Sequence, residues 1–285
     1  MALGHIDFDR AGPADKPSPS IWKDCPHQDL NDLGQGIFNH VNFDGPPTGV
    51  LAAALDVTMI SFGGRLALSA DTDTVLGTVS ADRGGVLQVD TDADDNDAAA
   101  LFSQPFGNIV RNSGNKLWFE AYVATGDVDA DLGLFIGLVE EDAVDGTTTN
   151  ALDVLLDGVA ANAVVAESLI GFIQDNGDDN AFDIIYKKDA GTAVNPFTDV
   201  TNATAIASGD RASLTDDTLF KLGIKFNGIA KLEFYVNGIK IGTQDVDDTI
   251  DQAKDYCVVI NMKTGTTAAE HFRLGWVRWA HQERR

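Results

Sequence analysis

Residues 220–244, FKLGIKFNGIAKLEFYVNGIKIGTQ, decide the fold class of this chain. Apolar residues alternate with polar or small ones on both sides of Asn227-Gly228, which is the two-residue period of a strand with one buried face. Asn237-Gly238 is the strongest short-range signal for a tight hairpin turn, and it leads into a third run, IKIGTQ. The stretch therefore predicts consecutive antiparallel strands joined by hairpins.

Similar short runs, separated by Gly, Asp and Asn clusters, recur from residue 57 onward. They are residues 84–92, 117–123, 131–142, 167–175, 181–189, 255–265 and 271–282. We expect 131–142 to pair with 117–123, and 167–175 to pair with 181–189 across NGDDN. Strands that recur in this way build an antiparallel sandwich or a closed barrel. The only segment with a helical composition is 149–171, whose position between strands suits an excursion or a lid.

The charge is strongly negative, with a formal net value of −24. Phosphate binding needs a basic face, so this charge argues against a nucleic-acid partner. The acids are 37 Asp and 7 Glu, beside 28 Gly. Asp and Gly favour turns over helices, which agrees with an all-β fold. Adaptation to salt would also make a chain acidic, and the sequence leaves that alternative open.

Two cysteines, Cys25 and Cys257, lie far apart and outside any CxxC motif. We interpret them as free thiols in a reducing compartment. The start, MALGHIDFDR, has no apolar leader, and no run reaches the length of a membrane span. The sequence thus predicts synthesis in the cytoplasm and no membrane partner.

Six of the eight prolines lie in the first fifty residues. Proline removes a backbone donor and restricts the preceding residue, so this region predicts neither a helix nor an inner strand. We divide the chain into an extended N-terminal arm, residues 1–45, and a sandwich domain, residues 46–285. The apolar residues Ile21, Trp22, Ile37 and Phe38 are predicted to anchor the arm on a partner. An arm folded back over its own domain is an equal alternative.

Three stretches carry a resemblance to a known fold family. They are KLWFEAYVATGDVDADLGLFIGLVEED, LFKLGIKFNGIAKLEFYVNGIKIG and VVINMKTGTTAAEHFRLGWVRW. Together they resemble the concanavalin A-like (laminin G-like) jelly-roll sandwich over about residues 50–280. More narrowly, DDNDAAALFSQPF before LWFEAYV, behind PSPSIWKDCP, resembles virion proteins of tailed bacteriophages. That resemblance implies a capsid decoration or cement protein on the outer surface of the head, often a homotrimer, that binds the major capsid protein.

A pair of catalytic carboxylates is one candidate site, because glycoside hydrolases occur on this fold. Hydrolysis needs two carboxylates flanking the scissile bond. Glu120 and Glu233 have no acidic companion two or four residues later. Asp153 and Asp157 have the required spacing, but they lie in a Leu-rich stretch of uncertain structure. The five histidines show neither HxH nor HExxH spacing, and no glycine-rich phosphate loop is present. We therefore predict no catalytic residue, no cofactor and a protein that is not an enzyme.

Two Asp-rich stretches, DTDADDND (residues 90–97) and DVDADLG (residues 127–133), resemble calcium loops superficially. Both lack the Gly at position 6 and the Glu at position 12 that an EF-hand requires. Legume lectins bind calcium on this sandwich, so a structural ion is possible, but solvated turns are favoured. We predict no metal ligands.

Carbohydrate binding for attachment to a host surface is the alternative function. Trp118 and Tyr122 share one face of their strand, and Tyr235 points outward from the hairpin, so these rings would form a sugar platform. The interpretation we prefer is that the rings lie against the arm or against the second sheet.

Four lysines, Lys221, Lys225, Lys231 and Lys240, concentrate in the opening stretch, whereas residues 71–99 are rich in Asp. Lysine on the solvent face of a strand protects a sheet from aggregation. The functional interpretation is that these lysines meet the acidic loop of a neighbouring subunit, which together with the resemblance predicts a homotrimer.

Overall fold

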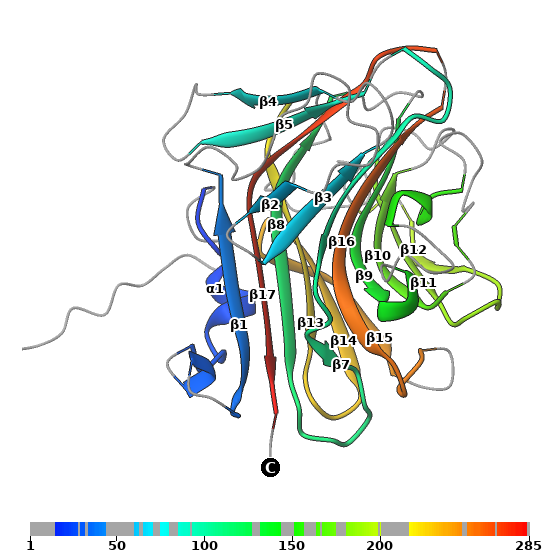
Figure 1. Cartoon of the computed structure of the whole chain (residues 1–285). Helices are drawn as coiled ribbons and strands as arrows, with labels where there is room; N and C mark the ends of the chain where they lie inside the picture. The colour runs from blue at the N-terminus through cyan, green and yellow to red at the C-terminus, as the bar shows by residue number, and fades with distance from the viewer. Residues whose placement is uncertain are drawn as a thin grey trace, which may run out of the picture.

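The computed structural model is a sandwich of two antiparallel sheets packed face to face (Figure 1). It describes residues 15–27, 29–31, 34–43, 60–62, 65–70, 75–79, 85–91, 93–126, 132–143, 151–156, 164–165, 167–174, 181–198, 200, 217–246, 250–265 and 267–283. The helices in these ranges are short, α1 having four residues, and none is long and apolar enough to cross a membrane. The predicted all-β sandwich is confirmed.

Sheet A has the strand order β15-β14-β13-β8-β17-β5-β4, with β1 beside β17. Its strands are β1 (Gly36–Asn42), β4 (Val75–Val79), β5 (Val86–Asp90), β8 (Leu117–Thr125), β13 (Phe220–Phe226), β14 (Lys231–Val236), β15 (Ile239–Asp245) and β17 (His271–Gln282). Sheet B has the order β12-β11-β10-β9-β16-β6-β3-β2, with β7 beside β16. Its strands are β2 (Ile60–Phe62), β3 (Leu66–Ala70), β6 (Ala98–Ser103), β7 (Gly107–Asn108), β9 (Leu132–Glu140), β10 (Leu169–Gln174), β11 (Asp183–Lys187), β12 (Val194–Phe197) and β16 (Asp255–Thr264).

The hairpins predicted from residues 220–244 are present. Strand β14 pairs with β13 on one side and with β15 on the other. Asn237 and Gly238 join β14 to β15 with φ values of 49° and 77°, the left-handed conformation that a type I′ turn requires. The predicted pairing of β10 with β11 is also confirmed.

The predicted pairing of residues 131–142 with 117–123 is wrong. Strand β9 lies in sheet B between β10 and β16, whereas β8 lies in sheet A between β13 and β17. All nine residues of β9 are buried, so both of its faces are covered and it lacks the alternation that marks a half-exposed strand. The chain therefore changes sheets between β8 and β9 instead of turning back on itself.

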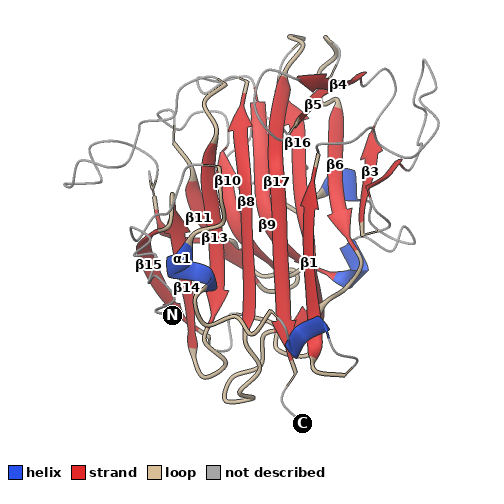
Figure 2. Ribbon diagram, turned by 90° about the vertical axis from the view of Figure 1, so that its left-hand side faces the viewer, coloured by secondary structure: helices blue, strands red, loops and turns tan. Residues whose placement is uncertain are grey.

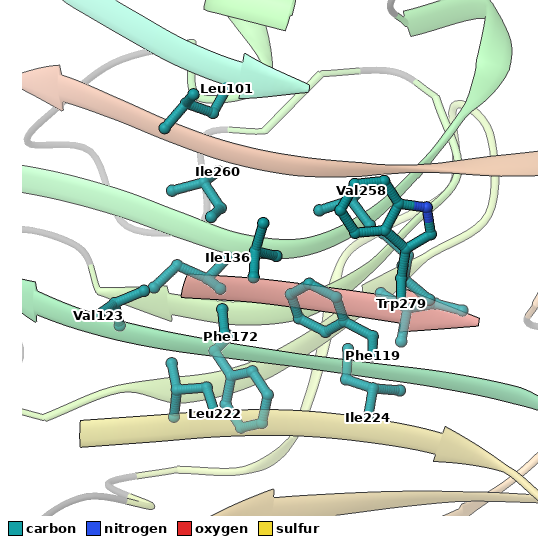
Figure 3. Packing of buried hydrophobic residues seen from close by; sticks show 14 of the residues in the cluster. Leu101, Phe119, Val123, Ile136, Phe172, Leu222, Ile224, Val258, Ile260 and Trp279 are labelled. Carbon is teal, nitrogen blue, oxygen red and sulfur yellow. The ribbon is translucent and has the colours of Figure 1, made fainter. Parts of the chain in front are cut away.

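The main core lies between the sheets. Figure 3 shows Phe119, Ile224 and Trp279 of sheet A packed against side chains of sheet B such as Ile136 and Val258. All five side chains are at most 1% exposed. Burying one such side chain contributes about 1.5–3 kcal/mol, so these alternating positions account for much of the stability.

No α-helix is present in the described part of residues 149–171. The segment contains the 3-10 turn η3 (Ala151–Asp153) and a bridge between Leu155 and Val164. Both of these side chains are buried against Phe135 on the outer face of sheet B. Asn261 of β16 also accepts a hydrogen bond from the Leu155 backbone N–H at 2.9 Å. The segment is thus an excursion that covers the outer face of sheet B.

The N-terminal region joins sheet A in two ways. Helix α1 (Pro19–Trp22) packs on the outer face of the sheet, in front of its strands in Figure 2, and β1 is itself a strand of the sheet beside β17. The turn η1 (Asp29–Asn31) connects this helix to β1. Strand β1 pairs with β17 along its whole length, from Gly36 opposite Gln282 to Asn42 opposite Trp276. The expectation of an extended arm separate from the body is therefore wrong for residues 15–43. The boundary predicted at residue 45 lies outside the described residues.

Candidate functional site

The predicted arm anchors pack on their own chain. Ile21 is 0% and Trp22 4% exposed, in a cluster with Trp118 of β8. Phe38 is partly buried, with its ring edge-on to Trp22 at a centroid distance of 6.3 Å, while Ile37 is exposed. The alternative of an arm folded back over its own domain agrees with this packing. Ile21 and Trp22 are not available to a partner while the segment is in place.

A buried carboxylate holds this segment, residues 15–31, which we call the N-terminal segment. Glu120 of β8 is 0% exposed, and its Oε2 accepts hydrogen bonds from Trp22 Nε1 at 2.7 Å and from the Ser18 backbone N–H at 2.9 Å. Burial raises the pKa of Glu120, and the bonds from Ser18 and Trp22 oppose that shift. The Arg278 guanidinium lies 4.3 Å from the centroid of the Trp22 ring, within cation–π range. Glu120 therefore secures the segment.

Two of the predicted inter-subunit lysines lie under the same segment. Lys221 is 2% and Lys225 7% exposed. Lys225 Nζ pairs with Asp24 Oδ1 at 2.7 Å, and Lys221 Nζ donates to the carbonyl of Lys16 at 3.1 Å. Burial raises the pKa of Asp24, but hydrogen bonds from Lys225 and from Lys116 outweigh it and lower the pKa. The prediction that Lys221 and Lys225 face a neighbouring subunit is wrong, because the chain's own N-terminal segment covers them.

The other two lysines are more exposed but also have partners within the chain. Lys231 pairs with Asp245 at 2.5 Å, and Lys240 pairs with Glu233 at 3.1 Å. Exposed pairs of this kind contribute little to stability and are screened by salt. An inter-subunit role for Lys231 and Lys240 stays a prediction, as does the trimer.

Two of the three rings considered as a sugar platform are covered. Trp118 is 0% and Tyr235 5% exposed, both in the cluster with Ile21 and Trp22. The preferred interpretation, that these rings lie against the arm, is confirmed for both. Tyr122 is different, since it is only half-buried and does not belong to this cluster.

Tyr122 belongs to a group that we call the aromatic stack, formed by Tyr122, Trp276 and His40. The rings of Tyr122 and Trp276 lie 5.9 Å apart at 26°, and those of Trp276 and His40 lie 6.0 Å apart at 22°. A β-carbon on Gly275 would lie 2.6 Å from the Tyr122 ring, so only glycine lets this ring lie across the strand. The three rings come from neighbouring strands β8, β17 and β1.

Beside the stack lies a chain of hydrogen-bonded side chains, which we call the polar row: Asp90, Gln88, Arg273, Asp217 and His271. Gln88 Nε2 donates to Asp90 Oδ1 at 2.6 Å, and Arg273 Nε donates to Gln88 Oε1 at 2.8 Å. Asp217 Oδ1 then accepts from Arg273 Nη1 at 2.8 Å and contacts His271 Nε2 at 2.7 Å. Asp217 has a φ of 60°, which Asp tolerates better than most residues.

A bulge brings the stack and the row to one face. The register of β17 against β8 shifts between Leu274 and Trp276. Because Leu274 and Val277 both point into the core, Arg273 and Trp276 both point outward. In Arg273, His271 and Asp217 the side chains are 24%, 25% and 42% exposed. Together the two groups form a partly exposed surface, the polar–aromatic face, that offers a ring and several fixed donors and acceptors. A histidine held by a carboxylate can also transfer protons.

A second group of polar side chains lies at one end of sheet B. One carboxylate oxygen each of Glu140, Asp189 and Asp251 lies within 4.8 Å of the others, and we call these residues the carboxylate trio. Burial raises the pKa of Glu140, opposed by hydrogen bonds from Ser168. Sequence reasoning missed this group because its members come from three separate segments without a shared motif.

The Asp-rich stretches considered as calcium loops show no such convergence in their described parts. Asp90 belongs to the polar row, Asp94 and Asp95 are exposed, and Asp97 is buried. Residues 127–131 lie outside the described residues, so the second stretch stays untested.

Comparison with known proteins identifies a fold but no family. No family model and no curated protein matches the sequence. Among solved structures, a protein of unknown function from Shewanella oneidensis MR-1 aligns with a TM-score of 0.53 and 11% identity over 90% of this chain and 94% of that one. The carbohydrate recognition domain of Emp47p aligns with a TM-score of 0.47 and 11% identity, over 87% and 97%. The resemblance to the concanavalin A-like jelly roll is thus confirmed as a fold. The phage origin, the capsid partner and the place on the virion stay predictions.

The prediction that the chain is not an enzyme is wrong, because it was inferred from the sequence pattern although enzymes share this fold. The structures that share the fold include the alginate lyase AlyC3, with a TM-score of 0.46 and 10% identity over 70% of this chain and 76% of that one. They also include an endo-β-galactosidase from Clostridium perfringens and a β-glucanase from Bacillus licheniformis. At such identities the likeness shows the fold alone and assigns neither a reaction nor a catalytic residue. The lack of a clear catalytic pair of acids in the sequence therefore does not decide whether the chain is an enzyme.

Proposed function

We propose that this chain binds carbohydrate and that the polar–aromatic face is its binding surface. The observation that carries the proposal is the half-buried ring of Tyr122 beside polar side chains that already hold one another in place. A sugar presents C–H groups on its ring faces and hydroxyls around its edge. Aromatic rings suit the first, and carboxylate, amide and guanidinium groups suit the second.

The polar row is organised before any ligand arrives. Arg273 is held on one side by Gln88 and on the other by Asp217, and Asp217 also holds His271. Side chains fixed in this way lose little conformational entropy on binding, so more of the interaction energy contributes to affinity. The row spans β5, β17 and Asp217, which lies three residues before β13, and the two strands give it a rigid base.

The charge of the chain narrows the class of carbohydrate. A formal net charge of −24 repels acidic polysaccharides over several ångströms, so neutral glycans fit better. Neighbours described as carbohydrate recognition domains are compatible with this function. The capsid-decorating function keeps only the sequence resemblance as support, because Ile21 and Trp22 of the arm that would bind the capsid are buried on their own sheet.

A panel of neutral glycans, followed by calorimetry on the best ligand, tests the proposal. Replacing Gln88 with alanine should weaken binding by about 2- to 10-fold, the range expected for one neutral hydrogen bond. The matched control is Gln104→Ala, an exposed glutamine between β6 and β7, which should bind like the wild type. Absence of binding to every neutral glycan, or equal affinity for Gln88→Ala and wild type, overturns the proposal. The same mixtures are assayed for new reducing ends, whose appearance would change the function from binding to catalysis.

A further inference from the structure

The carboxylate trio joins three parts of sheet B that are distant in sequence. Glu140 is the final residue of β9, Asp189 follows β11, and Asp251 precedes β16. Glu140 pairs in register with Tyr256 of β16, and the Tyr256 hydroxyl donates to the Asp251 carbonyl at 2.9 Å. The positions of Glu140 and Asp251 are therefore fixed by the sheet itself.

Burial distinguishes this group from an ordinary acidic surface. Glu140 is 4% and Asp251 8% exposed, while Asp189 closes the group from the solvent side. Glu140 Oε2 is buried and has no hydrogen-bond partner among the described residues. Buried polar atoms are almost always paired, and a cation held among the three carboxylates would pair this buried oxygen.

The nearest lysine does not supply that charge. Lys254 is close enough to lower the pKa of Glu140, but its Nζ forms an ion pair with Asp142. Asp189 is held by Ser168, whose hydroxyl donates to Asp189 Oδ1 at 3.2 Å and accepts from the Asp189 backbone N–H at 3.1 Å. These contacts orient Asp189 without neutralising it.

We propose that Glu140, Asp189 and Asp251 bind a divalent cation, with Ca²⁺ preferred to Mg²⁺. Oxygen ligands lie about 2.4 Å from Ca²⁺, so oxygens on opposite sides of the ion are about 4.8 Å apart, and the trio fits within that span. Three carboxylates on fixed elements form the kind of protein cage that suits Ca²⁺, whereas Mg²⁺ keeps most of its water and uses one or two carboxylates. The ion would tie the ends of β9 and β11 to the start of β16. This site is separate from the polar–aromatic face and does not depend on the proposed function.

Thermal unfolding of the full chain, treated with EDTA and desalted, tests the site. CaCl₂ at millimolar concentration should raise Tm by several degrees, and MgCl₂ should raise it much less, because an ion that binds only the folded state stabilises it by mass action. The Ca²⁺-dependent shift should be lost in Glu140→Gln and in Asp189→Asn, because each removes one charged ligand. Asparagine is chosen at position 189 because it tolerates the φ of 43° there. Asp95→Asn, an exposed residue of the Asp-rich turn before β6, is the matched control and should keep the full shift.

Terbium luminescence gives a second measurement that does not depend on stability. Tb³⁺ replaces Ca²⁺ and emits when a nearby tyrosine is excited, and Tyr256 lies next to the trio. Emission should rise in the wild type, fall on addition of CaCl₂, and be absent in Glu140→Gln. In EDTA, Glu140→Gln should unfold at or above the wild-type temperature, because it removes one of three repelling charges. A wild type without a Ca²⁺-dependent shift, or a Glu140→Gln protein that keeps the shift or the emission, overturns the proposal.

Discussion

Replacing Trp22 with alanine measures how strongly the N-terminal segment belongs to the fold. The Trp22 side chain is 4% exposed, donates a hydrogen bond of 2.7 Å to buried Glu120, and lies under the Arg278 guanidinium. The substitution removes all three contributions at once. Other contacts of the segment with sheet A stay in place, among them the Asp24–Lys225 ion pair and the hydrogen bond from the Ser18 N–H to Glu120. Strand β1 also keeps its own hydrogen bonds to β17.

The expected loss follows from these contacts. A buried aromatic side chain of this kind removes about 150–250 Å² from water, which at about 25 cal/mol per Å² gives an upper bound of about 4–6 kcal/mol. Substitutions of buried Trp by Ala cost about 3–5 kcal/mol, and losing a hydrogen bond to a charged group costs about 1.5–3 kcal/mol. Since the two overlap, we expect a loss of about 4–6 kcal/mol in the free energy of unfolding.

Urea unfolding followed by tryptophan fluorescence and by circular dichroism provides the measurement. Trp22→Phe separates the two contributions in large part, because it keeps most of the buried aromatic area and removes the indole N–H with a smaller part of the ring. It should cost about 1.5–3 kcal/mol in the wild type and clearly less in a Glu120→Gln background, where the acceptor is uncharged. A Trp22→Ala protein within about 0.5 kcal/mol of the wild type would refute the packing of this segment on sheet A.

Two further predictions concern buried titratable groups. Burial raises the pKa of Cys25 and of Cys257 to about 12, so neither thiol should react with a thiol reagent at pH 8 until the protein is unfolded, and fast labelling of both in the native state would contradict their burial. Burial lowers the pKa of His281 below its ordinary value of 6.5, so the unfolded chain takes up a proton first as the pH falls below 6.5, and stability is lost in that range. The unfolding free energy of His281→Gln should therefore depend less on pH between 6.5 and 5 than that of the wild type, and equal slopes would count against it.

The strands near 220–245 were predictable because their pairing is local. Alternation marks which face is buried, and Asn237-Gly238 fixes the turn and with it the register. The partner of β9 was not predictable in the same way, because a strand buried on both faces carries no alternation and adjacency in sequence suggested a hairpin. Only the packing of the two sheets decides that the chain crosses between them.

The candidate sites were less predictable than the strands. Alternation placed Tyr122 and the lysines on the outer face of sheet A, but it could not show that a proline-rich segment with no periodicity covers Lys221 and Lys225. The polar row and the aromatic stack share a face because of the bulge at Gly275, and a single glycine inside a strand pattern is only a weak sign of such a bulge. Likewise, Glu140 ends an apolar strand, and its sequence neighbours give no sign of a site. Only the topology of the sheet brings it close to Asp189 and Asp251.

The strand order also has a consequence for synthesis on the ribosome. The turn that carries Trp22 binds a surface that is complete only when β17 has been made, and 251 residues separate His27 from Arg278. At about 5–20 residues per second, this interval is roughly 12–50 s. During that time the nascent chain carries an apolar turn with no docking surface, a state in which chaperones bind and premature association occurs. A nascent chain stalled before β17 should therefore stay bound to chaperones, whereas the released full chain should not.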